Sequence, residues 1–363
     1  MSELILALEC YLAELRVSLE AHAGEGIPNA VPGLLSEPVC TQPGLQPHLA
    51  NTVRRLNEVI REQAFTQWWQ ADDAWELGRQ IQAAISRVQV IGSVAFLGKF
   101  GSHSHRSALR QYPDAVMLPV HSFSIACGMV MQGGADAAVL PIDNSTAGTI
   151  AEVYDLLLRN DLHIARAASL AIRNVLLGVP GSSAADVREV WTHPQPIAQC
   201  AGVIAERGWK TVSMESTAAA AESVAFRNDR SVAAIGSREA AFLYGLVVLE
   251  EGIDDADTNQ TRFVTVTRAL NISRDATRIS LVFTLPHESG SLSSVLSRMA
   301  DFGLNVAKIQ SRPIPNRAWE YSFHLDFESR IENTNALKAL YMLDHDLPYM
   351  KLLGWYAEGA NPI

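Results

Sequence analysis

Four polar clusters in the middle of the chain carry residue types that could bind or act on an anionic substrate. The first, Gly98–Ser104, lies between a short apolar run and a helical pattern. Glycines there let the backbone approach a ligand, and the N–H groups of a helix N-terminus favour anions. The second, 141–149, reads PIDNSTAGT, and its hydroxyls and amide could bind carboxylate oxygens without adding charge. Both have structural alternatives, a glycine turn and helix capping by Ser or Thr.

The other two clusters lie further along the chain. His193–Pro196 is followed at a distance by Glu215–Thr217, and Asn259–Phe263 places a Thr-Arg pair at the edge of a predicted strand. That pair could act on an anionic substrate, although chance produces such a tripeptide easily. His103 and His105 form an HxH pair, but no acidic or cysteine cluster completes a metal site. We therefore expect no metal.

Composition narrows the classes of protein that this chain can be. Its 363 residues are 48% hydrophobic and 19% charged, which is typical of a globular protein of two or three domains. The formal net charge is -10 without a basic run, which argues against a nucleic-acid partner. An anionic substrate would need a local patch of donors working against this field.

The cysteine pattern and the apolar runs bear on the compartment. The four cysteines lie far apart, so we expect neither a disulfide scaffold nor a zinc site, and a reducing cytoplasm is the natural location. Residues 1–9 carry two acidic residues and no basic one, unlike a secretory signal. No apolar run is long enough to span a membrane, so we expect no membrane partner.

The elements that must position the clusters follow from apolar periodicity. From Ser93 onward, short apolar runs alternate with helical patterns, which favours an α/β fold with mostly parallel sheets. The predicted strands are 94–98, 137–142, 232–236 and 262–266. The predicted helices between them are 104–111, 150–158, 218–226 and 239–249.

The two ends of the chain have apolar patterns that differ from those of the middle. Residues 1–90 show three helical patterns, the later two at 48–65 and 71–88, and predict a small helical domain. From Arg278, predicted strands 279–284, 306–312, 319–327 and 350–355 combine with predicted helices 291–302 and 335–343. The order βαββαβ is that of a ferredoxin-like module, and such modules often pair, so we expect a homodimer or a higher homo-oligomer.

Taken together and in this order, the clusters resemble the prephenate dehydratase family over about 94–268. The resemblance rests on the Phe-Leu-Gly run at 96–98, the Pro-Ile-Asp-Asn-Ser-Thr run at 141–146, 154–157, 193–196, 216–217, 244–246 and 261–263. The following module, 277–357, resembles the ACT domain of this family. The order of segments is similar to the bacterial bifunctional P-protein, in which a chorismate mutase domain of helices comes first.

The resemblance implies a fold and a reaction. The segment 93–268 would form two α/β lobes like those of a type II periplasmic binding protein, with the site between them. Prephenate would lose CO2 and water to give phenylpyruvate, in phenylalanine biosynthesis and without a cofactor. By this resemblance Thr261 is the donor at the leaving hydroxyl. The implied substrate contacts are Ser102, Asp143, Asn144, Ser145, Thr146, Gln195, Ser216, Thr217, Arg262 and Phe263.

The resemblance also implies regulation by L-phenylalanine at the ACT module. The matching ligand-binding turns contain Gly290, Ser291, Leu292, Gln310, Ser311, Arg312 and Pro313. Gln310 stands where the family has a glutamate, and a neutral amide holds an ammonium group less well than a carboxylate does. Feedback inhibition is therefore expected, although this turn is altered.

Other departures affect the substrate site and the first domain. Lys99 replaces a proline of the usual Gly-Pro turn, His103 replaces an aromatic residue, and Asp143 replaces a glutamate. In the helical domain Glu9 stands where a chorismate mutase has arginine, and Gly24–Gly26 lacks a second arginine. We therefore expect a degenerate mutase domain that has lost its activity.

Three alternatives remain open from the sequence. One is a prephenate decarboxylase of a specialised pathway, which the intact Thr261–Phe263 motif disfavours. Another is a catalytically inactive protein that senses phenylalanine, which the altered residues Lys99 and Asp143 motivate. The third is that arogenate, the amino analogue of prephenate, is the substrate.

Overall fold

The computed structural model describes residues 75–359, apart from 86, 88, 257, 315, 316 and 318. The first two predicted helices lie outside the described residues. From Glu76 onward the chain forms one compact unit, which begins with α3 (Glu76–Ile85). This helix buries Ile81 and Ala84, and the Arg87 guanidinium donates to the carbonyl of Leu270 at 2.9 Å. The end of the predicted helical domain, 76–90, therefore packs with the later part of the chain.

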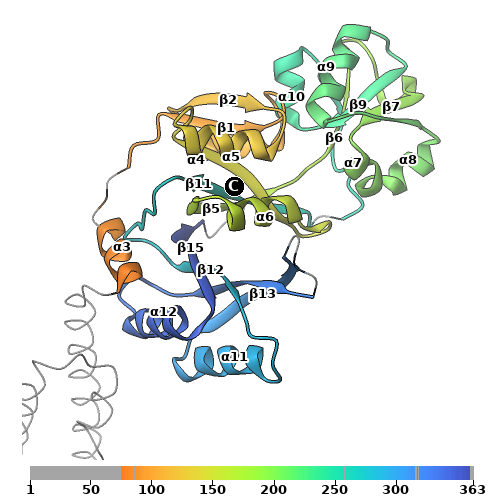
Figure 1. Ribbon diagram of the computed structural model, residues 1–363. Helices are drawn as coiled ribbons and strands as arrows, with labels where there is room; N and C mark the ends of the chain where they lie inside the picture. Colours follow the sequence, from red (N-terminus) through yellow and green to blue (C-terminus); the bar gives the residue numbers. More distant parts are fainter. Residues whose placement is uncertain are drawn as a thin grey trace, which may run out of the picture. The chain divides into compact units, whose positions relative to one another are not determined.

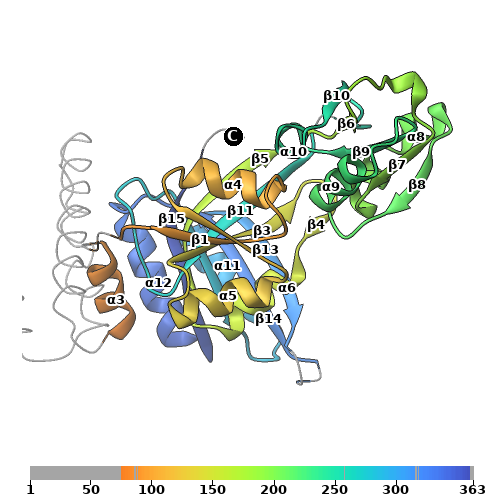
Figure 2. The ribbon, with the colours of Figure 1, turned by 90° about the horizontal axis from the view of Figure 1, so that it is seen from above.

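A first lobe is built on a mixed sheet with the strand order β5-β11-β3-β1-β2 (Figures 1 and 2). Its strands are β1 (Ser93–Leu97), β2 (Val116–Val120), β3 (Ala137–Asn144), β5 (His163–Ala171) and β11 (Gln260–Thr267). Its helices are α4 (His103–Gln111), α5 (Phe123–Gln132) and α6 (Ala151–Arg159). β1 is parallel to β2 and β3, whereas β11 is antiparallel to both β3 and β5.

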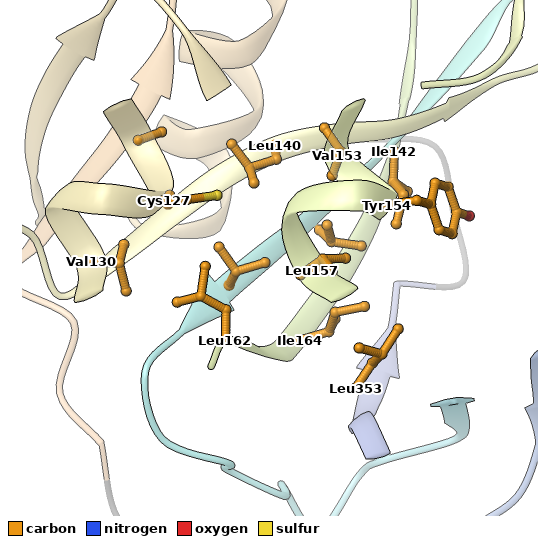
Figure 3. Close-up of a cluster of buried hydrophobic side chains, with 14 of the residues drawn as sticks. Cys127, Val130, Leu140, Ile142, Val153, Tyr154, Leu157, Leu162, Ile164 and Leu353 are labelled. Atoms are coloured by element: carbon orange, nitrogen blue, oxygen red, sulfur yellow. The ribbon is translucent and has the colours of Figure 1, made fainter. Parts of the chain in front are cut away.

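Apolar side chains fill both faces of this sheet. Figure 3 shows one cluster, in which Leu140 and Ile142 of β3 lie near Val153 and Leu157 of α6. Leu353, from the last strand of the chain, joins the same cluster. Burial of such side chains is the main force that holds strand and helix together.

A second lobe lies between β5 and β11 in the sequence. Its strands are β6 (Val175–Gly178), β7 (Glu189–Thr192), β8 (Lys210–Ser213), β9 (Val232–Gly236) and β10 (Val247–Glu250), in the order β10-β6-β9-β7-β8. Its helices are η2 (Ala184–Asp186), α7 (Pro194–Gln199), α8 (Ala201–Arg207), α9 (Thr217–Arg227) and α10 (Arg238–Tyr244). The chain enters after β5 and returns through β11, which explains why β11 runs against its neighbours.

The C-terminal module, Arg278–Glu358, has the predicted order βαββαβ. It consists of β12 (Arg278–Thr284), α11 (Ser291–Asp301), β13 (Asn305–Pro313), β14 (Tyr321–Glu328), α12 (Thr334–Asp346) and β15 (Tyr349–Glu358). The strand order is β13-β14-β12-β15, and all neighbours within the module are antiparallel. This is the ferredoxin-like arrangement.

The module continues the sheet of the first lobe. β15 pairs in parallel with β5 through Ala357 and Glu358. Gly354 makes a close approach possible, because a Cβ atom there would lie 2.2 Å from the carbonyl oxygen of Ile164. Together with the short strand β4 (Gly148–Thr149), which pairs with β3, the strands of the first lobe and the module form one ten-stranded sheet.

Two expectations from the sequence were wrong. The sheets are mixed rather than mostly parallel, because β11 returns from the second lobe and β6 and β10 are antiparallel to their neighbours. The helix expected at 239–249 ends at Tyr244, where Gly245 takes a left-handed conformation with φ 68°, and the chain continues as β10. No helix among the described residues could span a membrane.

Candidate active site

The centre of the candidate site is a pair of residues on neighbouring strands. Thr261, near the start of β11, lies opposite Asn144, the last residue of β3. The Asn144 amide Nδ2 donates to the Thr261 hydroxyl at 2.9 Å, and both side chains are buried. β3 and β11 thus place an amide and a hydroxyl at the same end of the sheet.

The orientation of the Asn144 amide is determined by its neighbours. Its Oδ1 accepts from the backbone N–H groups of Thr146 at 3.0 Å and Ala147 at 2.7 Å. Nδ2 must therefore point toward Thr261, whose oxygen acts as an acceptor in that bond. A hydroxyl has one proton and two lone pairs, so the proton of Thr261 remains free to be donated.

Two hydrogen bonds of Ser145 join the short loop after β3 to the segment that returns from the second lobe. The Ser145 hydroxyl donates to the carbonyl of Thr258 at 2.8 Å and accepts from the N–H of Gln260 at 2.9 Å. Asn259 accepts from Asn144 Nδ2 at 2.9 Å, and its own Nδ2 is buried without a partner among the described residues. Asn259 is a site residue that the predicted contacts omitted, although its place two residues before Thr261 was a signal.

The second lobe presents polar residues at the carboxyl edge of β7, β8 and β9. His193 caps α7, on which Gln195 is exposed, and Ser216 caps α9 by accepting from Ala219 N at 3.1 Å. Thr217 packs beside Gly236 at the end of β9. Ligands of open α/β sheets bind outside the carboxyl ends of the strands.

Contacts between the lobes bring this edge against the Gly98–Ser102 loop of the first lobe. The Ser237 hydroxyl donates to the carbonyl of Gly101 at 2.8 Å, and the Tyr244 hydroxyl donates to that of Phe100 at 3.1 Å. Lys99, the unusual residue in this turn, forms an ion pair with Glu222 of α9. The altered turn therefore acquires a contact across the two lobes.

Ser102 belongs to the same loop and caps α4. Its hydroxyl accepts from the N–H of His105 at 3.2 Å. Both ring nitrogens of His103 are buried without a hydrogen-bond partner among the described residues. Burial, together with the nearby Arg106, lowers the pKa of His103 to about 4, so the ring is neutral at pH 7.

Three predicted substrate contacts lie away from the Thr261 hydroxyl. Phe263 is buried in the core with Phe96 and Leu170. Asp143 and Arg262 meet each other on the face covered by the C-terminal module, 3.8 Å apart at their closest charged atoms. The structure thus brings Thr261, Asn144, Ser145 and Thr146 together and places Phe263, Asp143 and Arg262 elsewhere.

The residues predicted to bind an effector divide into two groups. Gln310 accepts from Thr149 at 2.7 Å, and Arg312 binds both oxygens of Asp155 at 3.0 and 3.2 Å, so both face the first lobe. Ser311 and Pro313 are exposed. Gly290 precedes α11, whose first residues Ser291 and Leu292 line a cavity of about 680 Å³ that none of residues 310–313 lines.

The arrangement at the active-site edge supplies neutral hydrogen-bond donors around one free hydroxyl proton. Among the described residues, no group of three or more His, Cys, Asp or Glu side chains could hold a metal ion. Neutral donors of this kind can orient carboxylates and assist the departure of a hydroxyl group.

Comparison with known proteins gives a consistent family. The family model described as prephenate dehydratase matches residues 94–271. An arogenate dehydratase/prephenate dehydratase 2 of Arabidopsis thaliana, described as chloroplastic, is 36% identical over 274 residues, which are 72% of this chain and 72% of that protein.

Two solved structures share the fold at similar identity. A prephenate dehydratase from Arthrobacter aurescens in complex with L-Phe is 32% identical with a TM-score of 0.67, over 73% of this chain and 90% of that one. A structure described as GqqA, a novel type of quorum quenching acylases, is 30% identical with a TM-score of 0.68, over 74% of this chain and 98% of that one.

Proposed function

We propose that this chain, which belongs to the prephenate dehydratase family, converts prephenate to phenylpyruvate, carbon dioxide and water. The observation that carries the proposal is the Thr261 hydroxyl. The Asn144 amide occupies its acceptor side at 2.9 Å, so its proton is available at the edge where the two lobes meet. A positioned donor is what the departing hydroxyl group of prephenate requires.

The reaction needs little more than orientation and one donor. The bond between the ring and its carboxylate breaks, and its electrons complete the aromatic ring while CO2 leaves. The carbon–oxygen bond of the ring breaks at the same time, and the oxygen departs with its electrons and takes up a proton to become water. Thr261 would stabilise the negative charge that develops on this oxygen, because a hydrogen bond to it strengthens as the bond breaks.

The substrate contacts in this proposal are neutral donors and helix N-termini. They come from the first lobe and from the facing edge of the second, and they are Ser102, Asn144, Ser145, Thr146, Gln195, Ser216, Thr217 and Asn259. Asp143, Arg262 and Phe263 act behind the site and do not touch substrate, because their side chains lie in the core or against the C-terminal module.

Arogenate is a second candidate substrate, and the name of the Arabidopsis relative supports it. Arogenate would lose the same two groups and yield phenylalanine. The product therefore separates the two substrates. A decarboxylase would release CO2 and retain the hydroxyl, and a sensor would release nothing. An acylase would need a nucleophile that a neighbouring base activates. The Thr261 hydroxyl lacks that activation here, because its neighbour Asn144 donates a hydrogen bond to it and does not accept its proton.

Regulation and assembly belong to the same proposal. The βαββαβ module would act as an ACT domain that responds to L-phenylalanine, which the relative solved with L-Phe supports. We also propose a homo-oligomer, a P-protein-like order of segments with an inactive chorismate mutase segment at residues 1–90, and a cytoplasmic location.

Replacement of Thr261 tests the proposed role. Thr261→Ala should lower kcat on prephenate by about 100-fold or more, as loss of a positioned proton donor does. Thr261→Ser should retain partial activity, because it keeps the hydroxyl. Phenylpyruvate formation gives the rates, and circular dichroism confirms that each variant is folded. Turnover of Thr261→Ala at the wild-type rate would remove Thr261 from the mechanism.

A further inference from the structure

We propose that Asp326 of the C-terminal module is a positioning residue for the reaction, and that it acts on Thr261 through Arg262 from the opposite face of the sheet. The inference rests on the dehydratase function proposed above. It makes the module part of the machinery that holds the active site in shape, in addition to any effector that it binds.

The contacts of Arg262 carry the argument. Arg262 follows Thr261 directly on β11, and its side chain is 13% exposed. Its guanidinium donates to Asp326 of β14 at 2.9 Å and to the Tyr356 hydroxyl at 2.7 Å, and it lies 2.6 Å from Glu358 of β15. Three module groups from two strands therefore hold the residue next to the proposed donor.

The acceptors are themselves fixed. Ser280 of β12 donates to Asp326 at 2.5 Å and is 2.7 Å from the Tyr356 hydroxyl. Burial opposes the positive charge on Arg262, but the Tyr356 hydroxyl and the two carboxylates outweigh it, so the pKa of Arg262 is raised. A buried guanidinium that several hydrogen bonds and ion pairs hold has little freedom to move.

The partner strand is held in the same way. Asn144, which donates to Thr261, follows Asp143, and Asp143 forms an ion pair with Lys308 of β13. Lys308 also donates to Tyr154 at 2.8 Å. Each residue of the Asn144–Thr261 pair is therefore next in sequence to a residue that the module binds. These contacts, on the opposite face of the sheet, fix the pairing of Thr261 with Asn144.

A matched control exists in a second ion pair between the module and the first lobe. Arg312 binds Asp155 of α6 at 3.0 and 3.2 Å, and neither residue belongs to β3 or β11. If the reaction needs only that the module stays bound to the first lobe, loss of the Asp326–Arg262 pair or of the Asp155–Arg312 pair should have the same effect on kcat. If Asp326 positions Thr261, only its loss should affect turnover.

The experiment compares Asp326→Asn with Asp155→Asn in the full chain, with kcat and KM for prephenate. A misplacement of about 1 Å costs roughly 100-fold, so we expect Asp326→Asn to lower kcat by about 10-fold to 100-fold with little change in KM. Asp155→Asn should stay within about twofold, because partly exposed pairs contribute little. Asp326→Glu should recover part of the loss.

A double-mutant cycle shows whether Asp326 acts through Arg262. Asp326→Asn combined with Arg262→Gln should be no slower than Arg262→Gln alone. If Asp326→Asn does not fold, Lys308→Met replaces it as the test, because Lys308 binds Asp143 beside Asn144, and it should also lower kcat. Equal kcat values for Asp326→Asn and Asp155→Asn would overturn the inference. If Lys308→Met has to be used, a wild-type kcat for that variant would overturn it. An inactive wild-type protein would instead reject the dehydratase proposal.

Discussion

At the scale of single residues, the chemistry depends on which groups fill each side of the Thr261 hydroxyl. Backbone N–H groups at 146 and 147 hold the Asn144 oxygen, so its nitrogen must face Thr261. This leaves the Thr261 hydroxyl with its proton and one lone pair free for a ligand. The proton is the part that can assist the loss of water.

A second residue, His324, makes the stability of the unit depend on pH. It lies on β14, is 3% exposed and packs against Tyr154 with ring centroids 4.7 Å apart. Both ring nitrogens lack a hydrogen-bond partner among the described residues. Burial lowers the pKa of His324 from 6.5 to about 4 despite the nearby Asp326, so the ring is neutral in the folded protein.

The sign of the effect follows from the two pKa values. Between pH 6.5 and 4 the unfolded chain binds a proton at His324 that the folded chain does not, so folding stability falls as the pH falls through this range. The difference in proton binding lowers the free energy of unfolding by about 3 kcal/mol at pH 4 and has no effect above pH 7. His324→Leu should therefore lose less stability than wild type on acidification, as measured by urea unfolding at pH 7 and pH 4. Equal losses in the two proteins would show that His324 does not titrate in this way.

At the scale of elements, the approach of β15 to β5 depends on one glycine. A Cβ at Gly354 would lie 2.2 Å from the oxygen and 3.0 Å from the carbon of the Ile164 carbonyl, which are backbone atoms. Gly354→Ala should lower the free energy of unfolding by about 3 kcal/mol, because the two strands must separate.

Gly128→Ala is the matched control for that substitution. Gly128 lies inside α5 with open space around its Cβ position, so alanine there should stabilise the helix by about 0.5–1 kcal/mol. Thermal unfolding of both variants tests the pair. A Gly354→Ala protein as stable as wild type would mean that β15 does not lie this close to β5.

Much of the element order could be predicted from the sequence, because apolar periodicity is local. The predicted strand 279–284 corresponds to β12 (Arg278–Thr284), and the predicted helix 291–302 to α11 (Ser291–Asp301). Short strands such as β8 (Lys210–Ser213) were missed, because only one of its four residues is apolar.

The site was harder to predict than the elements. The resemblance assigned Thr261 and residues of the polar cluster at 141–149 to one substrate site, but the bond between Asn144 and Asn259 joins residues 115 positions apart. No local pattern contains such a contact. The orientation of Arg262 did have a signal, because side chains alternate along a strand and its neighbour Thr261 faces the site.

At the scale of the whole molecule, the first lobe and the C-terminal module share one continuous sheet, and the second lobe has a sheet of its own. Two charged contacts between module and first lobe, Arg262–Asp326 and Lys308–Asp143, involve the residues next to the Asn144–Thr261 pair. An effector that shifted the module would therefore move the proposed donor. Because the formal net charge is -10, the neutral donors at the site are the local exception that an anionic substrate needs.

The most direct test is incubation of the full-length protein with prephenate at neutral pH, with phenylpyruvate followed by its absorbance in alkali. Parallel reactions contain chorismate, arogenate, and prephenate with added phenylalanine. Formation of phenylpyruvate from prephenate and not from chorismate, with slower turnover when phenylalanine is present, is the predicted result. A folded protein that forms neither phenylpyruvate from prephenate nor phenylalanine from arogenate would contradict the dehydratase function.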